Sequence, residues 1–466
     1  MTEEFPLRVR KALADPKLGA ALRTVSVQLR TRRAAGFQSL PNAEAIRDQA
    51  RKAKFDALRD LPNQLERFEA RLQASGVHVH WAETAAAAND IVVGIAKQHA
   101  ARLVAKGKSM VSEETHLNAA LEAAGCEVVE TDLGEYIVQL AGDRPSHIVA
   151  PIIHMTRGDV GRVMHERLQT PFSDDPTTLG GYARERLRTV FLRADMGITG
   201  ANFGVVETGT ICLVTNEGNG RMVTTLPRVH VVVMGIEKVI PTLADLDRFL
   251  KLLARSSTGQ KLSVYTTLIN GPRRSGDACG PESMHVVLLD NGRSRIIASD
   301  SAEILGCIRC GACMNVCPVY TSIGGHAYGD TYPGPVGAVL TPALRGLEKW
   351  ADLAGASSLC GACRDICPVR LDIPKMLLDL RRDSAPVMAP VWLRLAMRGF
   401  GWTVGRPRLY RWITGAARVA LRARAVDGWI ATAPGPAAAW TASRDLKAPA
   451  SRPFIEQWRR SRKADA

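Results

Sequence analysis

The sequence predicts an α/β domain with a largely parallel sheet, followed by a smaller unit that is built around cysteines. Helical segments alternate with short β-branched runs between residues 66 and 298, which is the pattern of helices packed on a parallel sheet. Seven of the ten cysteines lie between residues 307 and 367. The length of 466 residues suggests about three structural units. The hydrophobic share of 46% is typical of a globular protein with a sizeable core.

These patterns divide the chain into four parts. They are an N-terminal helical arm (1–65), the α/β domain (66–298), the cysteine-bearing unit (299–385) and a basic, Trp-containing C-terminal tail (386–466). The arm is rich in Arg, Ala, Leu and Glu, and its stretch Asn42–Arg59 follows a proline and contains no helix breaker. We therefore expect one helix over Asn42–Arg59.

Within the α/β domain, we expect helices over Asn63–Ala74, Ala85–Lys106 and Glu113–Ala124. Five β-branched or apolar runs predict strands, over residues 147–153, 211–215, 229–235, 264–269 and 284–290. Several of these runs are apolar throughout, as strands are when both faces of a parallel sheet are buried.

A glycine-rich stretch over residues 197–222 is the strongest candidate for a binding loop in this domain. Backbone amides around Gly218, Asn219 and Gly220, together with Arg221, are suited to hold the carboxylate or phosphate of a substrate. Glu207 is a weak candidate for an acid or base in catalysis. The sequence favours equally the simpler explanation that these glycines only turn strands.

Two familiar nucleotide-binding motifs are absent. Residues 106–109 are KGKS, like the end of a P-loop, but Arg102 stands where that motif requires a glycine. No G-x-G-x-x-G follows a predicted strand, so a Rossmann-type flavin or NAD site is not predicted.

The first cysteine run has the spacing C-x2-C-x2-C-x3-C-P. Its members are Cys307, Cys310, Cys313 and Cys317. This is the run of bacterial ferredoxins, in which the first three cysteines bind one iron–sulfur cubane and the fourth binds another. Structural zinc sites usually use two separate C-x2-C pairs, so we predict iron–sulfur clusters rather than zinc.

The second run, C-x2-C-x3-C-P, is one cysteine shorter. By the crossing rule, the ligands are Cys307, Cys310, Cys313 and Cys367 for the first cluster, and Cys317, Cys360 and Cys363 for the second. Ser357 stands where a fourth cysteine would complete the second run. One iron of the second cluster therefore has no obvious thiolate.

Four arrangements are compatible with this missing thiolate. The second site is a [3Fe–4S] cluster, or a [4Fe–4S] cluster with Ser357, His326 or another side chain as fourth ligand, or a cluster that recruits Cys279, or a cluster with one iron open to water or substrate. A [4Fe–4S] cluster with three protein thiolates is the preferred prediction. Cys279 is more simply explained as a small residue in a Gly-rich loop.

Charge and composition exclude several classes of protein. The 61 basic and 46 acidic residues give a net charge of +15, but no helix-turn-helix or RNA-binding signature is present, so nucleic-acid binding is not predicted. The N-terminus lacks the apolar core of a signal peptide, and no apolar stretch is long enough for a transmembrane segment. Clustered cysteines suit metal binding in a reducing compartment, so we expect a cytoplasmic protein.

The tail carries Trp392, Trp402 and Trp412 among Arg and aliphatic residues. This pattern is typical of an amphipathic surface. Packing against the cysteine-bearing unit, or docking of a partner, explains it better than contact with a membrane.

Four segments resemble the lactate utilization protein B family. In order they are KSMVSEETHLNAALEAAGCEVVETDLGEYIVQLAGDRPSHIVAPIIH, ADMGITGANFGVVETGTICLVTNEGNGR, GCIRCGACMNVCPVY and LCGACRDICPV. The resemblance covers nearly the whole chain. It implies that residues 66–298 are a LUD domain, similar to the sugar-phosphate isomerase and CoA-transferase group, and that an α-helical ferredoxin-type domain follows.

The resemblance also implies a function. The chain would be the iron–sulfur electron-transfer subunit of a complex that oxidises L-lactate to pyruvate. Two [4Fe–4S] clusters are implied, and the second has only three Cys ligands in the family itself, so Ser357 is not a departure. Two companion proteins are implied: a Cys-rich subunit similar to heterodisulfide reductase and a smaller LUD-domain protein.

Three other functions are compatible with the residues. They are an electron carrier for another 2-hydroxy acid such as glycolate, a non-catalytic iron–sulfur protein for interaction or regulation, and an enzyme that acts on a sugar phosphate or CoA ester through Glu207. Because no flavin motif is visible, we expect the hydride acceptor on a partner or at an unusual site.

Overall fold

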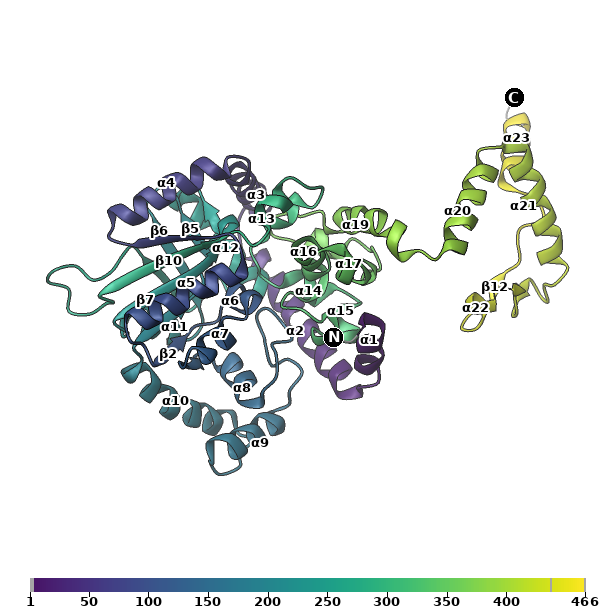
Figure 1. The fold of residues 1–466 in the computed structure, drawn as a ribbon. Coiled ribbons are helices and arrows are strands. Elements are labelled where there is room, and N and C mark those ends of the chain that lie inside the picture. The colour runs from purple at the N-terminus through teal and green to yellow at the C-terminus, as the bar shows by residue number, and fades with distance from the viewer. Residues whose placement is uncertain (1–3, 436–437, 465–466) are drawn as a thin grey trace. The chain divides into compact units, whose positions relative to one another are not determined.

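The computed structural model describes residues 4–435 and 438–464 (Figure 1). The chain forms two compact units, Met1–Ala385 and Pro386–Ala466. The first unit contains the two larger sheets and both cysteine runs.

A six-stranded sheet forms the centre of the first unit, and all of its paired strands run parallel. In spatial order its strands are β1 (His78–Ala82), β10 (Ser283–Leu289), β7 (Val229–Gly235), β4 (Met196–Thr199), β2 (Leu103–Lys106) and β3 (Glu127–Glu130). In this register, Val231 of β7 lies between His285 of β10 and Ile198 of β4. Every residue of β7 is buried, as expected for a central parallel strand.

Alternate residues of β7 face opposite layers of the domain. Val231 and Val233 pack with helix α5 (Ala85–Gln98), whereas Val232 and Met234 pack with α4 (Leu61–Ala74) on the other face. The other helices around this sheet are α6 (Met110–Thr115), α7 (Leu117–Ala123), α8 (Leu133–Ala141), α9 (Arg157–Leu168), α10 (Pro176–Arg193), α11 (Asn219–Thr225) and α13 (Arg293–Ile297) (Figure 1). The predicted α/β class with a parallel sheet is confirmed.

A smaller sheet of four strands adjoins the first. Its order is β8 (Val239–Ile240), β5 (Phe203–Val205), β6 (Thr210–Thr215) and β9 (Tyr265–Ile269), and the 3-10 turn η1 (Ile236–Lys238) joins β7 to β8. Helix α12 (Leu243–Ser257) packs on this sheet, where the rings of Phe203 and Phe249 stack with 5.0 Å between centroids. Two of the predicted strands, 211–215 and 264–269, therefore pair antiparallel in this second sheet.

The N-terminal helices are α1 (Phe5–Leu13), α2 (Pro16–Gln38) and α3 (Ala43–Arg59). Helix α3 confirms the helix predicted over Asn42–Arg59, and it touches two parts of the chain. Arg47 donates a hydrogen bond to the backbone oxygen of Cys367 at 2.7 Å, and Lys54 donates to the backbone oxygen of Glu237 in the α/β domain. The N-terminal segment thus ties the cysteine-bearing segment to the α/β domain.

The cysteine-bearing segment consists of short helices joined by tight loops. They are η2 (Ala302–Gly306), α14 (Ala312–Val316), α15 (Tyr320–Ile323), η3 (His326–Tyr328), α16 (Gly334–Arg345), α17 (Leu347–Trp350), η4 (Ala351–Gly355), α18 (Ala362–Ile366) and α19 (Ile373–Met388). Helices α14 and α15 pack against α2 (Figure 1). The predicted helical character of this segment is confirmed.

One predicted strand is wrong. Residues 147–153 form bends and turns rather than a strand. The imidazole Nδ1 of His147 accepts the backbone N–H groups of Val149 at 2.9 Å and of Ala150 at 3.0 Å. These local hydrogen bonds occupy the donors that a strand would offer to its neighbour.

Two predicted helices are also interrupted. The helix predicted over Ala85–Lys106 ends at Gln98, Ala100 takes a left-handed backbone (φ 49°), and the chain then enters strand β2. The helix predicted over Glu113–Ala124 is split into α6 and α7 at His116, which also has a left-handed backbone (φ 55°).

The second unit contains α20 (Val391–Val404), α21 (Pro407–Arg422), α22 (Ala438–Thr441), α23 (Phe454–Ala464) and a two-stranded sheet of β11 (Trp429–Ile430) and β12 (Leu446–Lys447). Trp392, Trp402 and Trp412 are all exposed. Their packing or docking role stays a prediction. Among the described residues, no helix combines the length and the apolar composition that crossing a membrane requires.

Candidate functional site

The two cysteine runs form matched loops, although the second lacks one cysteine. Arg309 and Leu359 are equivalent in the two runs, and both have left-handed backbones, with φ 59° and φ 55°. Gly311 and Gly361 follow at equivalent places with φ 76° and φ 84°. Helices α14 and α18 then begin at the same point of each run.

The matched loops place the Ser357 hydroxyl where the first run has a thiol. In the first run, the backbone N–H of Arg309 donates to Cys307 Sγ at 3.4 Å. In the second run, the backbone N–H of Leu359 donates to Ser357 Oγ at 3.1 Å. Ser357 therefore repeats the local geometry of Cys307 with oxygen in place of sulfur.

Thiols of the two runs lie close to one another, and Cys313 of the first run has both Cys363 and Cys367 of the second as neighbours. Burial, followed by the negative charges of Cys367 and Cys307, raises the pKa of Cys310. Burial, followed by the charge of Cys317, raises the pKa of Cys363 to about 12. Cys367 thus lies with the first run, while Cys317 lies with the second.

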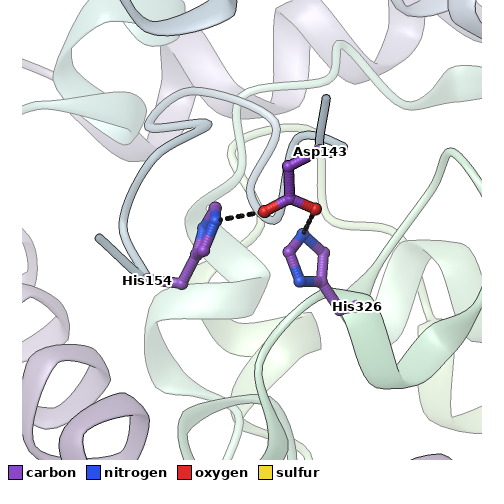
Figure 2. A group of neighbouring side chains, drawn as sticks. All are labelled: Asp143, His154 and His326. Atoms are coloured by element: carbon purple, nitrogen blue, oxygen red, sulfur yellow. Dashed lines mark hydrogen bonds and ion pairs between the residues drawn. The ribbon is translucent and has the colours of Figure 1, made fainter. Parts of the chain in front are cut away.

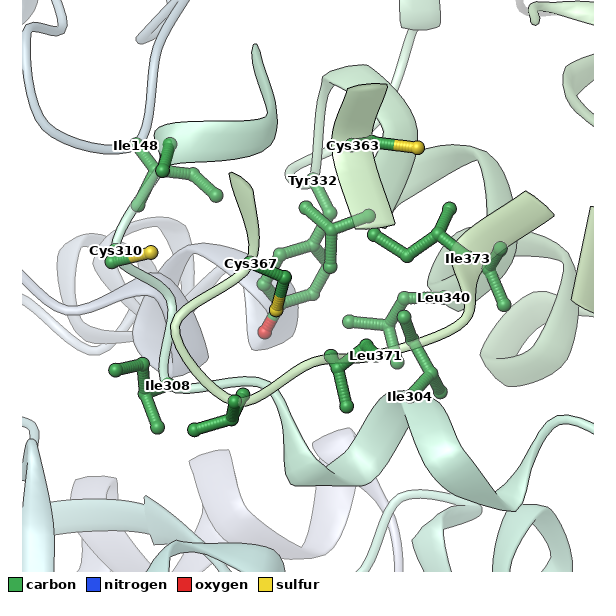
Figure 3. Packing of buried hydrophobic residues seen from close by; sticks show 14 of the residues in the cluster. Ile148, Ile304, Ile308, Cys310, Tyr332, Leu340, Cys363, Cys367, Leu371 and Ile373 are labelled. Atoms are coloured by element: carbon green, nitrogen blue, oxygen red, sulfur yellow. The ribbon is translucent and has the colours of Figure 1, made fainter. Parts of the chain in front are cut away.

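The burial and grouping of these cysteines are better explained by iron–sulfur clusters than by independent free thiols. All of them are free of disulfides, and Cys310, Cys317, Cys363 and Cys367 are buried. Figure 3 shows three of them among Ile, Leu and Tyr side chains. Such thiols stay protonated at neutral pH unless a metal displaces the proton, so the grouping suits a bound metal centre.

A cavity of about 320 Å³ opens where the α/β domain meets the first cysteine run. Its wall includes Lys108 from the loop after β2, Thr199 at the end of β4, Lys238 from η1, and Arg309 and Tyr332 from the cysteine-bearing segment. Ligands of open α/β sheets usually bind at the carboxyl ends of the strands, which is where this cavity lies.

Only part of the predicted glycine-rich loop reaches the cavity. Asn219 and Gly220 line it, whereas Gly218 and Arg221 do not, and the Arg221 side chain is exposed. Glu207 is also exposed and lies outside the cavity wall; its carboxylate accepts the backbone N–H of Leu243 at 3.0 Å and so caps helix α12. This position gives Glu207 a structural role and argues against one in catalysis.

Sequence reasoning missed the basic residues of the cavity. Lys108 belongs to the KGKS segment that fails the P-loop pattern, and its ammonium pairs with Glu135. Burial raises the pKa of Glu135 to about 7, against the lowering effect of Lys108. The sequence does contain one signal of a basic cavity wall. Arg309 is a charged residue inside the first C-x2-C loop, whereas the equivalent residue of the second run is Leu359.

His326 lies in a different cluster of side chains (Figure 2). Its Nε2 is 2.7 Å from the backbone oxygen of Arg144 and 3.9 Å from Asp143 Oδ1, while His154 Nε2 is 2.9 Å from Asp143 Oδ2. A hydrogen bond from His154 is the main cause that lowers the pKa of Asp143 to about 2. The three side chains are close enough to hold a metal ion, but both Nε2 atoms already make hydrogen bonds.

A parallel α/β domain joined to a helical segment with two interleaved cysteine loops defines a ferredoxin-type iron–sulfur protein. Residues 65–289 match the family model of the LUD domain, and residues 303–371 match that of the 4Fe-4S dicluster domain. Together with full-length relatives, these matches show that the chain belongs to the lactate utilization protein B family.

Two of these relatives illustrate the similarity. Lactate utilization protein B of Shouchella clausii (strain KSM-K16) is 44% identical, and the alignment covers 99% of this chain and 98% of that protein. Lactate utilization protein B of Geobacillus thermodenitrificans (strain NG80-2) is 43% identical over 98% and 97%. A crystal structure of a DUF162 family protein from Deinococcus radiodurans matches 49% of this chain and 98% of its own, at 16% identity and a TM-score of 0.28.

Proposed function

We propose that this chain is the iron–sulfur electron-transfer subunit of a complex that oxidises L-lactate to pyruvate. The name shared by its relatives supports lactate as the source of electrons. The observation that carries the electron-transfer role is the pair of matched cysteine loops, in which Cys367 lies near Cys310 and Cys317 lies near Cys363, as an exchange of the last cysteines would require. In two-cluster ferredoxins, this exchange brings two clusters close together.

The proposed ligands are those of the crossing rule. Cys307, Cys310, Cys313 and Cys367 would hold the first [4Fe–4S] cluster, and Cys317, Cys360 and Cys363 the second. A [4Fe–4S] cluster accepts and releases one electron at a time, so two of them suit a two-electron donor such as lactate. Cys310 and Cys367 of the first site are buried and its other two cysteines are half-buried, whereas Cys360 of the second site is exposed, which places the second site nearer to solvent.

Residues of the N-terminal helices would hold the second cysteine loop in place. Arg33 of α2 donates to the backbone oxygen of Ile366 at 2.7 Å, and Arg47 of α3 donates to those of Asp365 and Cys367. Such charged hydrogen bonds restrict the motion of the loop, which favours electron transfer by keeping the two sites at a fixed separation.

The complex would contain two companion proteins, a Cys-rich subunit similar to heterodisulfide reductase and a smaller LUD-domain protein. We place it in the cytoplasm, because seven reduced cysteines suit a reducing compartment. The hydride acceptor would then belong to a companion, since no dinucleotide fingerprint occurs in this sequence.

The test is an anaerobic reconstitution of the three proteins with their clusters intact. We expect L-lactate to bleach the visible absorption of this chain's clusters, and glycolate to do so more weakly. Cys363→Ser should abolish reduction of the second cluster, whereas Cys279→Ser, at an exposed cysteine outside the runs, should leave it unchanged. Absence of any lactate-dependent reduction in the wild-type trio would contradict the proposal.

A further inference from the structure

The cavity beside the first cysteine run contains a buried cation with unused hydrogen-bond donors. The Arg309 side chain is 6% exposed and lines the cavity. Neither terminal nitrogen of its guanidinium has a hydrogen-bond partner among the described residues, although the side chain also lies beside Cys307, and the nearest carboxylate oxygen, Glu237 Oε1, is 3.6 Å away. Because unpaired buried donors are costly, this arrangement favours a ligand that accepts hydrogen bonds.

A second cation shares this part of the cavity. Lys238 is 8% exposed, and burial, followed by the charge of Arg309, lowers the pKa of its ammonium to about 8. Glu237, the acid nearest to both cations, is already bound by Arg293 at 2.6 Å. This end of the cavity therefore attracts an anion.

The same cavity contains a buried acceptor without a donor. Asn219 is 4% exposed and its Nδ2 donates to Thr131 Oγ1 at 3.3 Å, but its Oδ1 has no partner among the described residues. A hydroxyl group on the ligand would satisfy this oxygen. The cavity thus offers donors for an anion and an acceptor for a hydroxyl.

Acidic residues in the wall limit the charge of the ligand. Asp132, Glu135 and Glu217 also line the cavity, and Glu135 pairs with Lys108. An ionised carboxylate in the wall would repel a phosphate with two negative charges more strongly than a carboxylate with one. A small monocarboxylate with a hydroxyl satisfies all three observations.

We propose that this chain itself binds the carboxylate of a small 2-hydroxy acid in the cavity, through Arg309 and Lys238, with Asn219 accepting the hydroxyl. The choice of L-lactate as the acid rests on the proposed function, but the site itself does not. Because Arg309 stands between Cys307 and Cys310 and its side chain lines the cavity, the bound acid lies beside the loop of the first cluster.

The test uses the anaerobically purified full chain, with iron counted for every variant, and equilibrium dialysis against labelled L-lactate. We expect Arg309→Gln and Lys238→Met each to weaken binding about tenfold to a hundredfold. Lactamide, which keeps the hydroxyl but has no charge, should not compete. Propionate, which lacks the hydroxyl, should bind more weakly than L-lactate, and Asn219→Leu should remove that difference.

Arg364→Gln is the matched control, because it removes an arginine from the second cysteine run that is half exposed and does not line the cavity. It should bind L-lactate like the wild type. If Arg309→Gln loses iron, Lys238→Met and Asn219→Leu decide, because neither lies in a cysteine run. The site is disproved if the wild type binds no L-lactate at about 10 mM, or if Arg309→Gln and Lys238→Met bind it normally.

The outcomes for the site and for the complex are separable. Binding of L-lactate by this chain, without lactate-dependent reduction in the reconstituted trio, would keep the site and reject the proposed function. Reduction in the trio, without binding by this chain alone, would keep the function and move the substrate to a companion protein, which overturns the inference. If Arg309 serves only to balance the charge of the first cluster, we expect this second result, reduction in the trio without binding of L-lactate by this chain alone.

Discussion

At the scale of single residues, Ser357 differs from Cys307 by one atom in an otherwise repeated loop. Both side chains accept the backbone N–H two positions later, and both precede a residue with a left-handed backbone. A serine oxygen is a harder ligand than a thiolate and has a far higher pKa, so it holds iron less firmly. On this matched geometry, we propose Ser357 as the fourth, weaker ligand of the second cluster.

Variants of Ser357 test this ligand. Ser357→Ala should lose one iron from the second cluster on brief exposure to air, so that the count falls from about eight irons to about seven and a [3Fe–4S] EPR signal appears. Ser357→Cys should keep about eight irons under the same treatment. Ser275→Ala, at an exposed serine outside the cysteine-bearing segment, is the control. Equal iron loss in all three would contradict ligation by Ser357.

The sequence could predict the cysteines but not the cavity that adjoins them. Cysteine ligands follow a fixed local spacing, because one loop must wrap one cluster. Arg309, Lys238 and Asn219 lie on three segments that are distant in sequence, and only the folded chain brings them to one cavity. Asn219 was a predicted binding residue, whereas its neighbour Arg221 points to solvent because α11 turns it away.

At the scale of elements, a single ring holds the loop that replaces the predicted strand over residues 147–153. His147 is buried, and burial lowers its pKa to about 4, so the ring is neutral at pH 7 and its Nδ1 is free to accept. Its Nε2 is 3.3 Å from Asn315 Oδ1 in the first cysteine run. The loop therefore connects the α/β domain to that run.

His147→Ala should destabilise this connection. The backbone N–H groups of Val149 and Ala150 would lose their acceptor, at a cost of about 1–3 kcal/mol for each group that stays buried and unpaired. Urea unfolding of the cluster-loaded protein would measure the loss. His165→Ala, at an exposed histidine of α9, should cost far less. Equal midpoints for the two variants would show that the ring does not hold the loop.

Element boundaries were harder to predict than element types. Strand β2 has only four residues and follows helix α5 closely, so the Ala, Val and Lys residues in both obscure the change of period. The longer strand β7 was predicted with its observed bounds, because seven consecutive buried residues leave a clear apolar run. Short strands gain their stability from neighbours in the sheet, which local sequence does not contain.

At the scale of the whole molecule, a buried network of charges joins the α/β domain to the cysteine-bearing segment. Arg293 pairs with Glu114 at 2.8 Å and with Glu237 at 2.6 Å, and all three side chains are 1% exposed. Tyr332 donates its hydroxyl hydrogen to Glu114 at 2.6 Å. Each buried charge is compensated only while its partners stay in place.

Arg293→Met should therefore destabilise the first unit by about 3–5 kcal/mol, because it leaves Glu114 buried without its cation and removes the closest cation from Glu237. Chemical unfolding monitored by Trp fluorescence and by cluster absorbance would measure the effect. Arg295→Met, which loses one hydrogen bond at an exposed arginine of the same helix, should cost about 1 kcal/mol. Similar losses of unfolding free energy in the two variants would show that the buried network stabilises the first unit no more than one exposed hydrogen bond does.

Lys54 links the N-terminal helices to this network and makes stability depend on pH. Burial lowers its pKa from 10.5 to about 7 in the folded chain. Between about pH 7 and pH 10.5, the unfolded chain therefore holds a proton that the folded chain has released, so stability rises with pH through this window. Lys54→Met removes this contribution, and the wild type should gain stability over the variant as pH rises. Lys52→Met, at an exposed lysine of the same helix, is the control. A difference in unfolding free energy between the wild type and Lys54→Met that stays constant from about pH 7 to pH 10.5 would contradict this pH dependence.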